Sequence, residues 1–81
     1  MSERKKFSAG DIVEVRFGVW GMVIADEVAL FTDLRGKEIE FLKGKIPPKA
    51  VKIRGDRVGK DVFLAFKAVA VALDLPAPSR F

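Results

Sequence analysis

The chain contains five short apolar runs, each followed within a few residues by glycine, proline or an acidic turn, and this spacing most restricts its fold. In residues 12–17, Val13, Val15 and Phe17 share one face and charged side chains share the other, which is the period of a half-buried strand. Further strands are predicted at residues 22–25, 28–32, 37–42 and 49–54. Five short strands with brief connections predict a small barrel or sandwich.

The connections between these strands contain most of the glycine and proline. Gly18 and Gly21 bracket a predicted short loop that contains Trp20. Residues 43–45 and the Pro47-Pro48 pair predict a stiff loop, because proline cannot donate to a strand ladder. In the strands beside that loop, the alternation places Ile39 and Phe41, and then Val51 and Ile53, on inward faces.

The last third of the chain changes to helical spacing. Residues 61–75 are predicted as a helix with Asp61 as its N-cap and Pro76 as its stop. Its apolar stripe consists of Val62, Phe63, Phe66, Val69, Ala70 and Leu73. Because several of these residues also favour β-structure, a strand that completes the sheet is the alternative.

The side chains that catalysis at neutral pH most often uses are missing. The 81 residues include no histidine, cysteine or tyrosine, which removes the commonest general base, metal ligand and thiol nucleophile. We therefore expect a binding protein and no enzyme, with no cofactor, metal or small-molecule substrate. No signal peptide is visible, and the longest apolar stretch, residues 62–73, contains Lys67 and is too short to cross a bilayer. These features predict a cytoplasmic protein. The 32% of charged residues, the many β-branched residues and the lack of cysteine together fit a heat-stable protein, and we expect an archaeal, thermophilic or viral source.

Charge is segregated along the chain. Residues 11–40 contain seven acids and three bases, whereas residues 43–60 contain seven bases and Asp56 alone. A basic surface of this kind attracts nucleic acid by releasing counterions. The predicted phosphate-binding residues are Lys43, Lys45, Lys49, Lys52, Arg54, Arg57 and Lys60, with Arg4, Lys5 and Lys6 as an auxiliary arm.

Low sequence specificity is expected of such contacts, and DNA and RNA stay equally open. Trp20 is either a residue that stacks on bases or a lid over the core. The other interpretation of the lysines is a solvated face.

A second function class follows from the predicted helix, which is apolar on every side except at Lys67. One sheet can cover only one side of it. The alternative function is thus a structural or adaptor module that forms a homodimer or docks on a protein partner. Its predicted interface residues are Leu64, Phe66, Val69, Val71 and Leu73.

Gly10-Asp11-Ile12-Val13-Glu14-Val15, followed by Gly21-Met22-Val23, resembles the start of an SH3-like barrel of the KOW type over residues 9–31. Domains of that type occur in ribosomal proteins and transcription elongation factors, and the resemblance implies a barrel that binds RNA or proteins. The loop at residues 17–20 is shorter than in that type, so no RNA contact is carried over from it. The expected fold is mainly β: an SH3-like five-stranded barrel at 9–58 with the C-terminal helix, in one domain at 9–81 after a flexible basic arm at 1–8.

Overall fold

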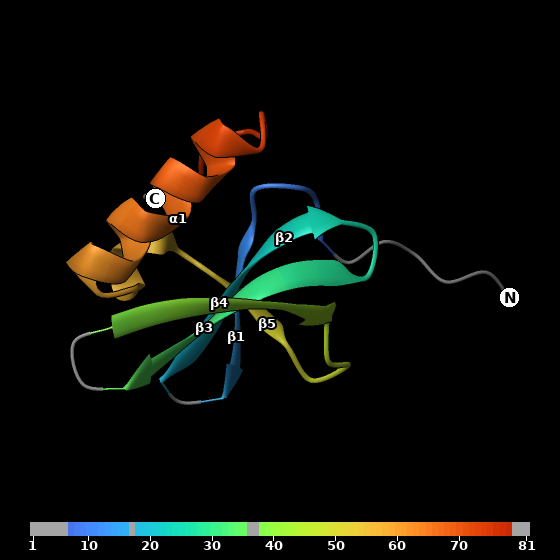
Figure 1. Cartoon of the computed structure of the whole chain (residues 1–81). Helices are drawn as coiled ribbons and strands as arrows, with labels where there is room; N and C mark the ends of the chain where they lie inside the picture. Colours follow the sequence, from blue (N-terminus) through green and yellow to red (C-terminus); the bar gives the residue numbers. More distant parts are fainter. Residues whose placement is uncertain (1–6, 17, 36–37, 79–81) are drawn as a thin grey trace, which may run out of the picture.

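The computed structural model describes residues 7–16, 18–35 and 38–78, which form one antiparallel sheet and one long helix (Figure 1). The strands are β1 (Ile12–Arg16), β2 (Val19–Ala25), β3 (Val28–Arg35), β4 (Glu38–Lys45) and β5 (Val51–Ile53). A 3-10 turn η1 (Gly55–Arg57) then leads into helix α1 (Lys60–Ala72), which lies across one face of the sheet. The predicted mainly β fold with five strands and a C-terminal helix is confirmed.

The strands are hydrogen-bonded in the order β4-β3-β2-β1-β5, so β4 and β5 lie at the two edges. The sheet is not closed, and the predicted barrel is therefore not confirmed. One reason is that β5 is shorter than the predicted strand at 49–54. The two prolines before it cannot donate, and the amide of Ala50 instead closes a turn on the carbonyl of Pro47 at 3.1 Å.

Both faces of the sheet bury apolar side chains. Ile12 of β1 packs with Met22 and Phe66 in a cluster beneath α1, which we call the helix-side core. Val13 packs with Val23 and Ala50 in a smaller cluster on the opposite face. The half-buried strand predicted for β1 is thus buried on both faces, because the second face has its own apolar cover.

That cover comes from two chain segments, one before β1 and one after β4. Phe7, before β1, and Ile46, after β4, both pack against the smaller cluster. The inward placement predicted for β4 and β5 holds for Ile39, Phe41 and Ile53, which contact the helix-side core. Val51 differs, since it is 61% exposed at the start of the short edge strand.

Helix α1 forms where the sequence predicts one, and the alternative strand is wrong. Val62, Phe63, Phe66 and Ala70 are its buried residues. The Phe66 ring meets the ring of Phe41 edge to face, with centroids 5.3 Å apart. The β-favouring residues are helical because this spacing brings them together on the sheet.

The ends of α1 differ from the prediction. Its N-cap is Gly59, which has no side chain to cap the helix. Asp61 lies inside the first turn, where the negative carboxylate interacts favourably with the positive end of the helix dipole. At the other end, the amide of Leu75 donates to the carbonyl of Ala70 at 2.8 Å and that of Asp74 to Val71 at 3.2 Å. This is a Schellman motif, and Asp74 takes the left-handed position usually held by glycine, at φ 58°.

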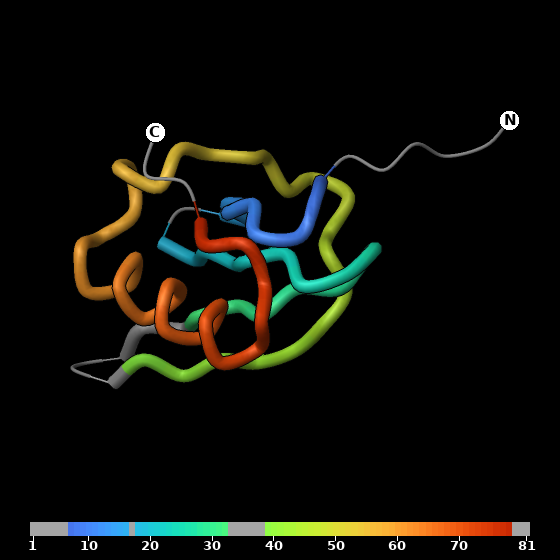
Figure 2. Tube along the Cα trace, turned by 90° about the horizontal axis from the view of Figure 1, so that it is seen from above, coloured from blue at the N-terminus to red at the C-terminus, as the bar shows by residue number. Residues whose placement is uncertain are grey.

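After α1 the chain turns back over the start of β1 (Figure 2). Gly10 has a φ of 94°, and a Cβ there would lie 2.9 Å from the carbonyl oxygen of Pro76. Glycine is needed at this position both for its backbone angle and for the close approach of the two segments.

The ring of Phe31 on β3 packs directly over Gly21 of β2. These two residues are direct cross-strand partners, and a Cβ on Gly21 would lie 2.5 Å from the Phe31 ring. The ring therefore covers the bare backbone of β2, a pairing of aromatic and glycine that pins strand register.

We expect Gly21→Ala to lower the free energy of unfolding by about 1–3 kcal/mol, because the Phe31 ring must leave its place on β2. Urea denaturation followed by circular dichroism measures this change. Gly44→Ala is the matched control, since a Cβ there would lie 3.7 Å from the same ring, at ordinary contact distance. Equal stability of the two variants would contradict the packing of Phe31 on Gly21.

Candidate nucleic-acid interface

The basic segment of the chain, residues 43–60, runs around the outside of the molecule. Figure 2 shows residues 43–60 passing from β4 around one end of the sheet to β5 and η1, with β1–β3 inside this path. All seven basic side chains predicted to bind phosphates are exposed: Lys43, Lys45, Lys49, Lys52, Arg54, Arg57 and Lys60. They do not form one face, because the segment that carries them runs from one edge of the sheet around its end to the other edge.

The sheet register separates two of these lysines further. Lys43 pairs with Leu30, whose other partner Met22 belongs to the helix-side core. Lys52 pairs with Val13, which belongs to the opposite cluster. Direct partners in an antiparallel pair lie on the same face, so the two lysines point from opposite faces and opposite edges of the sheet.

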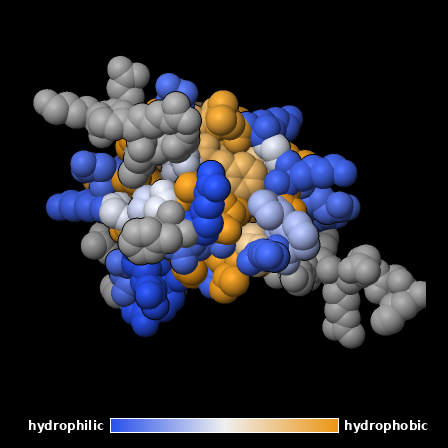
Figure 3. All heavy atoms as spheres, turned by 90° about the horizontal axis from the view of Figure 1, so that it is seen from below, coloured by the Kyte–Doolittle hydropathy of each residue, from blue (hydrophilic) through white to orange (hydrophobic). Residues whose placement is uncertain are grey.

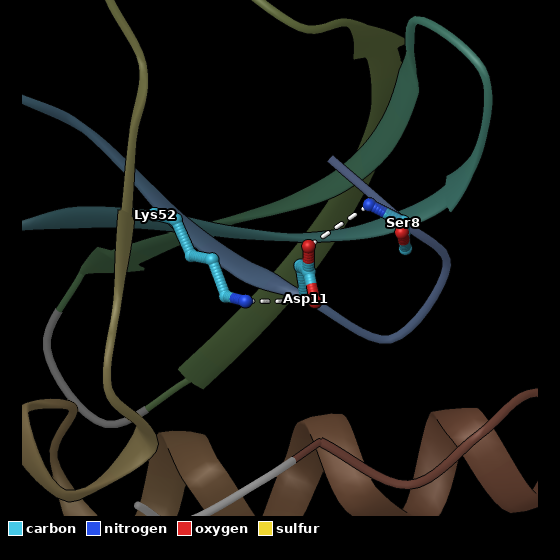
Figure 4. A network of polar contacts seen from close by, with 3 residues as sticks. All are labelled: Ser8, Asp11 and Lys52. Carbon is cyan, nitrogen blue, oxygen red and sulfur yellow. Dashed lines mark hydrogen bonds and ion pairs between the residues drawn. The ribbon is translucent and has the colours of Figure 1, made fainter. Parts of the chain in front are cut away.

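Two of the seven cations form ion pairs. The Nζ of Lys52 lies 3.7 Å from Oδ1 of Asp11, whose Oδ2 accepts a hydrogen bond from the amide of Ser8 at 2.9 Å (Figure 4). Nη2 of Arg54 donates to Oδ2 of Asp56 at 2.7 Å. A phosphate at Lys52 or Arg54 would have to compete with a carboxylate. Such exposed pairs contribute only about 0–1 kcal/mol, so the competition is mild.

The other five form no ion pair within the part of the chain that the structure describes. Their surroundings in the sequence differ. Arg57 and Lys60 have carboxylates beside them at Asp56 and Asp61, whereas residues 43–49 contain three lysines and no acid. We call Lys43, Lys45 and Lys49 the β4 basic edge.

The β4 basic edge is built on regular structure. Lys43 and Lys45 were predicted in a loop but lie in β4, two residues apart and therefore on one side of the strand, with Cα atoms about 6.6 Å apart. This end of β4 extends past α1 (Figure 1), which leaves both side chains exposed. Lys49 follows in the turn that begins at Pro47.

Carboxylates also approach this end of the sheet. The turn between β2 and β3 contains Asp26 and Glu27, and the amide of Ile46 donates to the carbonyl of Glu27 at 3.1 Å. The side chain of Glu27 is exposed. A polyanion at the β4 basic edge would thus bind beside one acidic turn, which restricts how it can lie there.

Lysines on an edge strand also have a structural role. Charged side chains there hinder pairing with the edge of another sheet, and β4 is the longer of the two edge strands. Lys43 and Lys45 suit this purpose without any ligand. A binding measurement separates the two roles, because edge protection requires no affinity for phosphate.

Trp20 lies in β2 and not in the predicted loop. It is half-buried, packs against the helix-side core, and its carbonyl accepts a hydrogen bond from Oγ1 of Thr32 at 3.4 Å. This placement matches the lid interpretation of Trp20. The auxiliary residues Arg4, Lys5 and Lys6 lie outside the described residues.

An apolar area that the sequence did not predict lies on the sheet face away from α1. Figure 3 shows apolar side chains in the middle of this face with hydrophilic ones around them. Leu42, which is 60% exposed, pairs there with the half-buried Phe31, and Val15 packs against the same cluster. No local pattern in the sequence indicates it, because it depends on the pairing of Phe31 with Leu42 across β3 and β4.

The five predicted interface residues of the helix divide into two groups. Phe66 is fully buried and is not available to a partner, whereas Val69 is half-buried against the helix-side core. Leu64, Val71 and Leu73 are exposed, by 49%, 72% and 49%. The helix and its C-cap residue Leu73 thus carry three of the five large apolar side chains that are exposed among the described residues.

No family model, curated protein or solved structure matches this chain. Among the described residues, no group of acidic side chains is placed to hold a metal ion. No helix in the described part of the chain has the length and apolar character needed to span a bilayer.

Proposed function

We propose that this protein binds nucleic acid without catalysis, through the β4 basic edge and with low sequence specificity. The observation that supports this most is a set of three exposed lysines, in a stretch without acids, that form no ion pair in the described structure. Charges that have no ion-pair partner among the described residues are available to phosphates. Each phosphate neutralised then releases condensed counterions.

The residue types favour backbone contacts. A lysine ammonium binds phosphate as a point charge, which fixes the position of the protein without reading the base sequence. The strand β4 fixes the backbone of Lys43 and Lys45, which carry two of the three charges, before binding. Less backbone freedom is therefore lost when phosphates are bound.

The exposed side chains also favour a duplex over a single strand as the ligand. Proteins that bind single strands without specificity stack bases on exposed aromatic rings. Among the described residues, every exposed large apolar side chain is aliphatic, and Trp20 and Phe41 pack against the helix-side core. Without such rings, affinity depends on charge density, which is greater on a duplex.

Fluorescence anisotropy at about 50 mM salt tests the proposal, with a labelled 20-base-pair duplex and with DNA and RNA single strands of the same length. We expect a duplex Kd at or below the range of about 10⁻⁴–10⁻⁶ M that is typical of nonspecific binding at physiological salt, since lower salt tightens binding, and we expect weaker single-strand binding. Two duplexes of unrelated sequence should bind equally well. No duplex binding at low salt would contradict the proposal and leave the lysines as protection of an edge strand.

A further inference from the structure

The outward side of α1 is apolar over most of its length. Leu64, Ala68, Val71 and Ala72 are exposed at the spacing of a single helical face. Lys67 is the charged residue along its middle, with Lys60 and Asp61 at its start. The sheet cannot cover this face, because α1 packs against it with the opposite side.

We propose that a second copy of this chain covers this face, with the two α1 helices packed antiparallel about a two-fold axis at Ala68. Residues on opposite sides of Ala68 along the helix, at similar distances from it, then meet across the axis. Leu64 and Val71 lie to one side of Ala68 around the helix, so Leu64 meets Val71 of the other copy, and the half-buried Ala65 meets Ala72 on the other side. The large side chains thus pack together along one side of the interface and the small ones along the other, and Ala68 against itself allows the helices to approach closely.

The charges at the helix ends also suit this arrangement. Lys60 lies about 12 Å along the helix from Ala68 and Asp74 about 9 Å in the other direction, so an antiparallel pair brings Lys60 beside Asp74 of the other copy. The last turn of α1 has no basic residue to balance its dipole, and Lys60 of the second copy supplies one. Asp61 of the same chain lies at this end too, so Lys60 lies between the carboxylate of Asp61 and that of Asp74 in the other copy.

The pattern selects a second copy over an unrelated partner. A two-fold interface must be complementary to itself, with each residue paired to its counterpart across the axis. On this face the large residues Leu64 and Val71 lie on one side of Ala68 and the small residues Ala65 and Ala72 on the other, so each side meets its own counterpart in a second copy. A different protein would place no such requirement on the order of Leu64, Ala65, Val71 and Ala72.

Sedimentation velocity at several hundred micromolar protein, without nucleic acid, tests the pairing. We expect the wild type to sediment with twice the 8.9 kDa chain mass and Ala68→Glu to sediment as the single chain. Ala68 is exposed, so the thermal transition of dilute Ala68→Glu should match that of the wild type at the same concentration. Leu42→Glu is the control, because Leu42 is also apolar and exposed but lies on β4.

A mixing experiment identifies the partner as a second copy. Ala68→Glu and Ala68→Lys each place like charges against themselves at the axis, and we expect both to be monomeric alone. Mixed in equal amounts, they should restore the double mass, because glutamate then faces lysine. A monomeric wild type at this concentration would overturn the pairing, as would a dimer that persists in Ala68→Glu or a mixture that stays monomeric. These outcomes are independent of nucleic-acid binding.

Discussion

Reversing the three charges of the β4 basic edge should lower duplex affinity by roughly 100-fold or more. Each lost charge-assisted contact costs about 1 kcal/mol or more, and about 1.4 kcal/mol is a factor of ten in affinity. The variant is Lys43→Glu, Lys45→Glu and Lys49→Glu, and anisotropy at low salt measures its binding. All three side chains are exposed, so the thermal transition should stay near that of the wild type.

A matched triple variant separates a site from a general effect of charge. Arg16→Glu, Arg57→Glu and Lys60→Glu also change exposed side chains, and each reversal lowers the net charge by two. Both triple variants therefore take the net charge from +4 to −2. We expect the second to bind duplex much more tightly than the first. Equal losses would show that binding follows net charge and that the β4 basic edge is not the site.

Truncating Phe66 should have the largest effect on stability. Phe66 is fully buried, and its ring contacts that of Phe41 across the layer between α1 and the sheet. Phe66→Ala should lower the free energy of unfolding by about 3–5 kcal/mol through lost burial and a cavity. A domain of this size has a total of about 5–10 kcal/mol, so the melting temperature should fall by roughly 15–30 °C.

Two further variants keep this test informative if Phe66→Ala does not fold. Phe66→Leu retains most of the buried volume and should cost about 1–2 kcal/mol. Leu64→Ala, two residues away on the exposed side of α1, should change stability in dilute solution by less than about 1 kcal/mol. A melting temperature unchanged in Phe66→Ala would contradict the placement of α1 on the sheet.

The fold could be predicted where local pattern and tertiary packing agree. Alternation in β4 correctly placed Ile39 and Phe41 inward, and the helical spacing of Val62, Phe63 and Phe66 matches the buried face of α1. The prediction was wrong where glycine was interpreted as a loop signal. Trp20 and Lys43 lie next to glycines yet belong to strands, because Phe31 covers Gly21 and also lies against Gly44.

Only the residues of the candidate site could be predicted from the sequence, and not their arrangement in space. The sequence identified the basic residues, and the structure shows all those described as exposed. Whether they share one surface could not be predicted, because a segment that is basic in sequence can run around the end of a sheet as well as cover one face of it (Figure 2). The pairing of Lys52 with Asp11 depends on β1 and β5 being neighbours, and short local patterns carry no information about strand order.

The central claim, that the β4 basic edge neutralises phosphates, is tested most directly by the salt dependence of duplex binding. The variants to compare are the wild type and the neutral triple Lys43→Gln, Lys45→Gln and Lys49→Gln. On a duplex, the slope of log affinity against log salt is about −0.9 for each phosphate neutralised. If all three lysines bind phosphates, the slope of the triple variant should be shallower by about 2.7. Parallel lines for the two proteins would contradict the claim, because the three lysines would then release no counterions.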